Sequence, residues 1–289
     1  MSTDLAQPTT RAAFTRAIAR HPLPAFLLWF FTVGQALAFA PVAFDDAVDD
    51  VPRQLFIVAS TLFGLLLPAL VITHVTEGPG AVRELLRRAV DVRVGARWYA
   101  LALLVVPAVT LGIAFLVSGV PQDATPGTWV TAVVQGWVLA LVLTFLPNNL
   151  WEEVAWTGFF QTRLQRRHTP VIAATVTALF FALQHVSGAA GGSFTEIAFL
   201  MAFLFVLVLP FRFLAGWVYN RTASLFIVGL IHGVGNATAG GSGFQDGLLA
   251  RLYDGNDISG LAHLIAFFLI GLTVVAATRG RLGRSDRSA

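Results

Sequence analysis

Residues 100–117 read ALALLVVPAVTLGIAFLV, a run without a single charge. A helix that crosses the hydrocarbon core of a bilayer needs ~20 predominantly apolar residues, so this run predicts a membrane span. Similar apolar runs occur on both sides of it, and we expect an all-α polytopic integral membrane protein with about eight transmembrane helices. The expected spans are 23–44, 54–76, 98–119, 128–147, 170–187, 196–219, 223–238 and 260–279.

Three parts of this assignment have alternatives. The seventh span is short, and residues 148–165 are an ambiguous continuation of the fourth. Residues 1–40 also resemble a signal peptide, because a basic start precedes an apolar run and small residues. The basic region is long, however, and the apolar run is long enough to span, so we favour a membrane helix there.

The composition supports the membrane class. The chain of 289 residues is 56% hydrophobic and 12% charged, whereas soluble domains carry ~25% charged residues. The absence of cysteine excludes disulfides, cysteine metal ligands and thiol nucleophiles. All 19 basic residues are arginine, which is typical of a GC-rich bacterial genome. In a membrane protein such arginine-rich loops indicate topology, and no nucleic-acid partner is expected.

The charges alternate from loop to loop. Arginines cluster in 11–20, 83–97, 163–167, at Arg221 and in the tail, while the intervening loops are acidic or uncharged. The positive-inside rule then places both termini in the cytoplasm, and we expect a multi-pass protein of the bacterial cell membrane. Arg53 and Arg251 are the exceptions to the pattern.

The predicted domains follow from these spans. Residues 1–22 and 280–289 are cytoplasmic tails, and 23–279 form a single transmembrane domain whose motif-bearing core is 148–240. Segment 78–93 carries apolar residues at helical spacing opposite its arginines. It is either an amphipathic helix on the cytoplasmic surface or an ordinary basic loop.

Polar residues inside the spans mark a candidate site. An ionisable group there costs ~2.5–3.5 kcal/mol on insertion scales, so it normally faces the protein interior. Glu152, Glu153, His185, His232 and Asn236 are such residues, and the last two are four apart on one helical face. His74 and His263 lie near span ends, where water is available, and Glu196 opens a span.

Depth estimates bring three of these residues together. Glu152 lies eleven residues from Arg163, and His232 lies eleven from Arg221. Both are therefore ~16 Å deep at ~1.5 Å per residue, and His185 lies somewhat deeper. Carboxylates, imidazoles and an amide in one buried cavity can activate water and stabilise an oxyanion. The alternative is that each residue is a polar clasp between helices.

Three motifs carry a resemblance to a known family. Residues 152–159 read EEVAWTGF, residues 181–185 read FALQH and residues 232–236 read HGVGN. In order and spacing they resemble the EExxxR, FxxxH and HxxxN motifs of the CAAX-processing and bacteriocin-processing (CPBP, or Abi) intramembrane proteases, which include the type II CAAX prenyl endopeptidases. Thr157 stands at the position where the first motif has its arginine.

The resemblance implies an endopeptidase that cuts a membrane-anchored protein or peptide, CAAX-like or otherwise, in contact with the lipid bilayer. By carry-over, Glu152 is the general base for water with His185 as its partner, and His232 and Asn236 donate to the oxyanion. Glu153, Thr157 and Phe181 are supporting residues.

Two questions stay open in the sequence. The protein either needs no cofactor or uses a divalent metal such as zinc, for which Glu152, His185 and His232 are the candidate ligands; the HExxH zinc motif is absent. The rival functions are a catalytically weak or inactive binding or immunity protein of the same fold, which Thr157 favours, and a small-solute transporter. No paired interrupted helices support a transporter.

Overall fold

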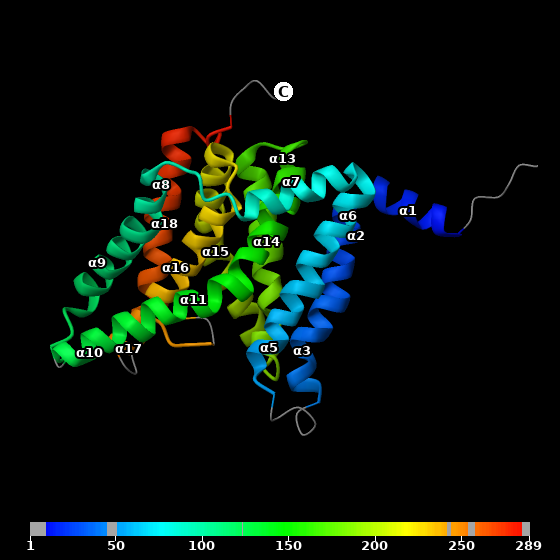
Figure 1. The fold of residues 1–289 in the computed structure, drawn as a ribbon. Coiled ribbons are helices and arrows are strands. Elements are labelled where there is room, and N and C mark those ends of the chain that lie inside the picture. Colours follow the sequence, from blue (N-terminus) through cyan, green and yellow to red (C-terminus); the bar gives the residue numbers. More distant parts are fainter. Residues whose placement is uncertain (1–9, 45–50, 123, 242–243, 254–257, 285–289) are drawn as a thin grey trace, which may run out of the picture.

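The computed structural model describes residues 10–44, 51–122, 124–241, 244–253 and 258–284. The aspartates of the first loop, on which part of the charge pattern rests, lie outside these residues, as do the two ends of the predicted tails. The described residues form helices and no strand, which confirms the all-α prediction. Figure 1 shows an elongated bundle whose helices run between two ends.

Seven helices are long and apolar enough to span a membrane within the described residues. They are Pro22–Ala43 (α2, η1, α3), Arg53–Glu77 (α5, η2, α6), Ala96–Ser118 (α8, η3, α9), Pro126–Gln165 (α10 to α13), Pro170–Ala189 (α14, η7), Phe194–Thr222 (α15) and Ile258–Thr278 (α18). The remaining expected span, 223–238, corresponds to α16 (Leu225–Thr238), which has 14 residues. At ~1.5 Å per residue α16 is ~21 Å long, which is less than the thickness of the bilayer core. The described residues therefore contain seven candidate spans and one short apolar helix.

Short π-helical stretches interrupt several spans. They are η1 (Phe30–Gly34), η2 (Ser60–Leu66), η3 (Leu101–Val105), η4 (Ala132–Leu139), η5 (Phe145–Asn149) and η6 (Val154–Gln161); η7 (Gln184–Ala189) is a 3₁₀ helix. The α-helical pieces between them are α2 (Pro22–Trp29), α3 (Gln35–Ala43), α5 (Arg53–Ala59), α6 (Leu67–Glu77), α8 (Ala96–Ala100), α9 (Val106–Ser118), α10 (Pro126–Thr131), α11 (Ala140–Thr144), α12 (Leu150–Glu153), α13 (Thr162–Gln165) and α14 (Pro170–Leu183). The other helices of the described residues include α1 (Thr10–Arg20), α7 (Pro79–Ala89) and α17 (Leu248–Leu252).

The fourth span resolves the ambiguity over residues 148–165. They continue the preceding helix, and Pro126–Gln165 is one helix of 40 residues. Its length of ~60 Å exceeds the bilayer core twofold, and Figure 1 shows it crossing the bundle obliquely. Pro147 lies inside it and cannot donate a backbone hydrogen bond, which accounts for the irregular turn η5.

Local sequence signals set the helix ends. The hydroxyl of Thr125 accepts a hydrogen bond from the amide of Thr128 at the start of α10. Ser193 and Glu196 form a reciprocal capping box at the start of α15. Gly119 ends α9 with φ 73°, a conformation that disfavours other residues.

Close helix packing relies on glycine. A Cβ added to Gly64 would come 2.4 Å from the Cα of Gly34, so η1 and η2 touch along their backbones. The hydroxyl of Ser60 donates to the carbonyl of Gly34 at 2.8 Å across the same contact. Small residues permit such approaches between membrane helices.

The basic elements gather at one end of the bundle. The guanidinium of Arg163 (α13) pairs with Glu77 at the end of α6, at 2.6 Å. Arg88 of α7 donates to the hydroxyl of Tyr219 near the end of α15, at 2.7 Å. In Figure 1, α7, α13 and the C-terminal end of α18 lie together at the top, and the ends of α3 and α5 lie at the bottom.

Segment 78–93 contains an amphipathic helix rather than an ordinary loop. In α7, Leu85 and Ala89 are buried, while Arg87 is exposed and Glu84 is partly exposed. A Cβ added to Gly158 would come 2.8 Å from a methyl carbon of Leu85. The apolar face of α7 therefore packs directly on η6, one residue beyond Thr157.

Candidate active site

Both glutamates of the first motif lie where the long helix is irregular. They end α12, between the π-helical stretches η5 and η6. Glu152 is 4% exposed and Glu153 is fully buried. Successive residues of a helix point about 100° apart, so the two carboxylates face different partners. π-Helical turns inside α-helices occur frequently at functional sites.

Glu153 is held by three side chains. Arg212 of α15 donates to both carboxylate oxygens, at 2.5 and 2.9 Å, and is itself fully buried. The hydroxyl of Thr157 donates to Oε2 at 2.6 Å, and Nδ1 of His232 lies 3.0 Å from Oε1. All of these partners can donate, so the carboxylate of Glu153 is committed to a structural network.

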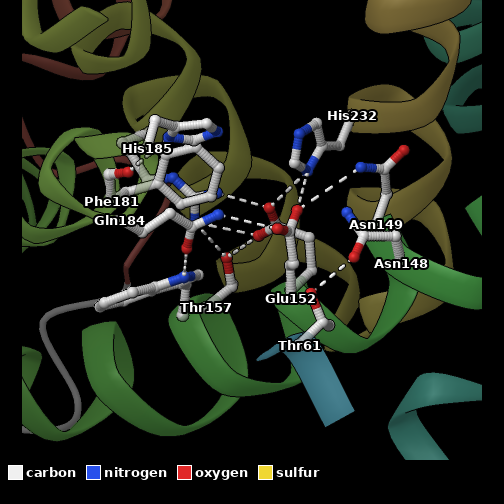
Figure 2. Close-up of polar contacts among 12 residues, drawn as sticks. Thr61, Asn148, Asn149, Glu152, Thr157, Phe181, Gln184, His185 and His232 are labelled. Carbon is white, nitrogen blue, oxygen red and sulfur yellow. Dashed lines mark hydrogen bonds and ion pairs between the residues drawn. The ribbon is translucent and has the colours of Figure 1, made fainter. Parts of the chain in front are cut away.

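Glu152 has neutral hydrogen-bond donors instead. The amide of Gln184 donates to its Oε1 at 2.7 Å, and that of Asn149 approaches Oε2 at 3.5 Å. Nδ1 of His232 lies 3.8 Å from Oε2. Figure 2 shows Gln184, Asn149 and His232 converging on Glu152 from three sides. Glu152 lines a cavity of about 570 Å³.

The four residues predicted to be catalytic share this cavity. Glu152, His185, His232 and Asn236 all line it, so these residues meet in one cavity as expected, while their chemical roles stay predictions. The rest of the wall is mixed. It includes apolar side chains such as Ile57, Leu200 and Leu204, and it reaches Arg53, Ser187 and Gly188 at its outer part.

Hydrogen bonding fixes the orientation of both histidines. Nδ1 of His185 lies 3.0 Å from the carbonyl oxygen of Phe181, one helical turn earlier. Because a carbonyl or a carboxylate can only accept, Nδ1 carries the proton in His185 and in His232. Nε2 is therefore the nitrogen of each ring that remains for chemistry. No direct hydrogen bond joins His185 to Glu152 among the described residues.

The supporting residues frame His232. The ring of Phe181, from the second motif, lies 5.6 Å from the His232 ring, and that of Phe211 lies 5.0 Å away. Asn236 follows one turn after His232 on α16, as expected from the spacing, and both line the cavity. Glycines allow α16 to sit this close: a Cβ on Gly233 would come 3.3 Å from Oδ1 of Asn149.

Sequence reasoning missed Arg212 and Gln184. Arg212 lies in the middle of an apolar span, and the cost of a charge there should have marked it as readily as the glutamates. Gln184 precedes His185 inside the second motif, where only the phenylalanine and the histidine define the pattern. It bridges the site, because its Oε1 also accepts a 2.6 Å hydrogen bond from Nε1 of Trp156.

His263 lies closer to the site than its position in the sequence suggests. The expectation of a water-exposed span end is wrong, because its Nδ1 is buried and has no hydrogen-bond partner among the described residues. Its side chain lines a second cavity of about 150 Å³, together with His185, His232 and Asn236.

The candidate metal ligands do not form a metal site. Within the described part of the chain, no group of three or more histidine, aspartate or glutamate side chains is arranged to hold an ion. Nε2 of both histidines remains available, but the oxygens of Glu152 face the amides of Gln184 and Asn149. In this arrangement the three side chains do not fit zinc, and a requirement for a metal stays a prediction.

Comparison with known proteins finds a family model that is similar to part of the chain. Residues 134–238 match the family model described as type II CAAX prenyl endopeptidase Rce1-like. This confirms the resemblance carried by the three motifs, all of which fall inside the Rce1-like stretch. The stretch runs from η4 to the end of α16 and covers less than half of the chain. No curated protein and no solved structure matches the chain.

Proposed function

We propose that the protein is an intramembrane endopeptidase that hydrolyses a peptide bond of a membrane-anchored or CAAX-like substrate, with water activated by Glu152. The observation that carries the proposal is the division of labour between the paired glutamates. Glu153 is fully buried and bonded to Arg212, whereas Glu152 lines the cavity with neutral amide partners. Only Glu152 is placed to take a proton from a water molecule in the cavity.

The remaining residues complete a hydrolytic reaction. Glu152 accepts a proton as the water oxygen adds to the peptide carbonyl carbon, and the C–N bond breaks as a proton passes to the leaving amine. We assign Nε2 of His185 to orienting the water. Nε2 of His232 and the amide of Asn236 donate to the developing oxyanion, which requires His232 to be doubly protonated. Its charge would then balance that of Glu152, since Arg212 already balances Glu153.

The cavity suits a substrate that is itself in the membrane. Its apolar wall is formed in part by α3, α5 and α15, where Val42, Ile57 and Leu200 line it. Glu152, His185, His232 and Asn236 line the same cavity. A chain held by a lipid or by its own apolar segment can therefore place its peptide bond beside Glu152 without exposing that segment to water.

We also propose that the protein has both termini in the cytoplasm. The ion pairs and hydrogen bonds that join α6, α7, α13 and α15 hold the described arginine clusters at one end of the bundle, and the positive-inside rule makes that end cytoplasmic. The cavity extends instead to Arg53, which begins α5, and to Ser187 and Gly188 of η7, which packs against α3. In Figure 1, α3 and the start of α5 lie at the opposite end of the bundle. On this orientation the substrate reaches Glu152 from the extracytoplasmic half of the membrane.

The inactive binding role loses the feature that favoured it. That role rested on Thr157 in place of an arginine, yet the guanidinium of Arg212 lies 3.1 Å from the Thr157 hydroxyl. The positive charge that the first motif lacks at residue 157 is therefore supplied by Arg212, from another helix.

The test is cleavage by purified protein in liposomes. One fluorophore–quencher peptide ends in a prenylated cysteine followed by three residues, and another carries an unmodified apolar transmembrane segment. We expect the wild type to cleave at least one peptide and Glu152→Gln to cleave neither while folding normally. Equal cleavage by Glu152→Gln, or intact peptides with folded wild type, would overturn the proposal.

A further inference from the structure

Arg212 and Glu153 form an ion pair from which water is excluded. Both side chains are fully buried, and the guanidinium donates to both oxygens of the carboxylate. The pair joins α12 to α15 across 59 residues of sequence. A bidentate arginine–carboxylate pair is directional as well as strong, so the position of Arg212 determines how the carboxylate of Glu153 is turned.

Thr157 mediates the same contact. Its hydroxyl donates to Oε2 of Glu153 at 2.6 Å and accepts from Nη1 of Arg212 at 3.1 Å. The guanidinium therefore occupies the space directly beside the residue that stands at the arginine position of the first motif. The positive charge still lies beside Glu153, but it comes from Arg212 of α15 instead of from the helix that carries the first motif.

The surroundings of Arg212 connect it to the second and third motifs. Its guanidinium carbon lies 4.3 Å from the ring centre of Phe181 and 4.7 Å from that of Phe211, distances typical of cation–π contacts. The same two rings contact the ring of His232, whose Nδ1 is held by Glu153. The orientation of His232 thus depends on Arg212 through Glu153 and through both rings.

We infer that Arg212 has taken over the task of the missing motif arginine, as a positioning residue that acts on His232 through Glu153. This inference rests on the proposed function, because it assigns Arg212 to the same site. Thr157 and Arg212 act as one unit: the threonine leaves room for a guanidinium that arrives from α15. Exchanging the two side chains should therefore return the arginine to η6, four residues after Glu153 on the same helix.

The experiment compares Arg212→Thr, Thr157→Arg and the double variant with the two peptides. At metal sites, loss of a side chain that hydrogen-bonds and orients a ligand typically lowers activity 10–100-fold, and we expect an effect of the same order for a residue that orients Glu153. We expect Arg212→Thr to lose about that much in kcat with little change in KM, because Arg212 does not line the cavity that holds the substrate. Thr157→Arg alone crowds two guanidinium groups beside one carboxylate and should also lose activity. The double variant should recover most of it.

Arg163→Thr is the matched control. It also removes a buried guanidinium from an ion pair, with Glu77, but at the far end of the long helix. We expect it to lower the melting temperature while leaving kcat per folded molecule unchanged. A fall in kcat specific to Arg212→Thr then reports positioning rather than general loss of stability.

The outcomes separate the inference from the proposed function. A folded Arg212→Thr with wild-type kcat, or a folded double variant as inactive as Arg212→Thr, overturns the inference. If Arg212→Thr does not fold, the double variant decides: folding with activity supports the exchange, and failure to fold contradicts it. If the folded wild type cleaves neither peptide, the proposed function fails, and recovery of the melting temperature in the double variant still tests the exchange of charge.

Discussion

The amide of Gln184 donates a 2.7 Å hydrogen bond to Glu152, while its oxygen accepts a 2.6 Å hydrogen bond from the indole of Trp156. One side chain from the end of α14 is thus fixed by a buried tryptophan and in turn fixes the proposed base. An amide can serve both partners at once because it carries a donor and an acceptor.

Replacing this amide should affect both stability and rate. Gln184→Leu leaves the buried indole N–H of Trp156 without its acceptor, which costs about 1–3 kcal/mol, and it frees the carboxylate of Glu152 to rotate. We expect a lower melting temperature and a fall in kcat of about tenfold or more.

Gln161→Leu provides the contrast. Gln161 is also buried, but neither its amide nitrogen nor its oxygen has a hydrogen-bond partner among the described residues. Removing an unsatisfied polar group from the interior should be neutral or stabilising, with kcat unchanged. If both leucine variants melt and cleave alike, Gln184 does not hold Glu152.

The sequence predicts the class of fold and four of the cavity residues, because burial of charge in a membrane is costly wherever it occurs. The same rule applies to Arg212. It indicates that the buried charge of Glu153 has an oppositely charged partner, but it does not indicate which helix supplies that partner. His263 is different. Its distance from the three motifs in the chain gives no signal, and only the packing of α18 against α15 and α16 brings it near His232.

The helix count was harder to predict for physical reasons. Apolar runs report hydropathy but not how far a helix tilts or continues. Pro147 would ordinarily end a helix, yet the π-helical turn η5 carries the chain past it, and 128–147 and 148–165 become one oblique helix. Helix α15 ends just before α16 because Ala223 adopts a left-handed conformation, with φ 55°. The sequence does not predict this conformation.

The position of Arg212 depends on a glycine in α18. A Cβ added to Gly271 would come 2.4 Å from the carbonyl oxygen of Pro210, two residues before Arg212. A backbone atom cannot move aside as a flexible side chain does, so Gly271→Ala should push α18 from α15 and destabilise the protein by about 1–3 kcal/mol. We expect kcat to fall as well, because Arg212 shifts with α15.

Gly112→Ala is the control for this substitution. A Cβ there meets nothing within 4 Å, and alanine favours helix over glycine by about 1 kcal/mol. Thermal unfolding in detergent should therefore show Gly271→Ala below the wild type and Gly112→Ala at or above it. The reverse order would contradict the packing of α15 against α18.

The surface helix α7 gives a prediction about pH. Hydrogen bonds from Arg87 and then Arg88 lower the pKa of Glu84 from 4.5 to about 2. A lowered pKa means that these pairs contribute fully above pH about 4.5 and are lost as the pH falls through about 2. Carbon NMR of the Glu84 carboxyl group in micelles should show this low midpoint, and Arg87→Gln should raise it more than Arg88→Gln. A midpoint near 4.5 in the wild type would show that the pairs do not form.

The last prediction tests which side of the membrane the cavity faces. The chain has no cysteine, so single cysteines can be introduced without background labelling. Gly188 lines the cavity at its outer part, and a Cβ there meets nothing within 4 Å. His168 is exposed next to Arg167, three residues after the end of α13, and α13 lies at the opposite end of the bundle in Figure 1. In intact cells, a membrane-impermeant maleimide should label Gly188→Cys and leave His168→Cys unlabelled. Opening the cells should allow His168→Cys to be labelled.

A peptide with an apolar segment should slow labelling of Gly188→Cys, because the peptide and the maleimide compete for the cavity. Labelling of His168→Cys alone in intact cells would invert the proposed topology, and unaffected labelling of Gly188→Cys would place the peptide elsewhere.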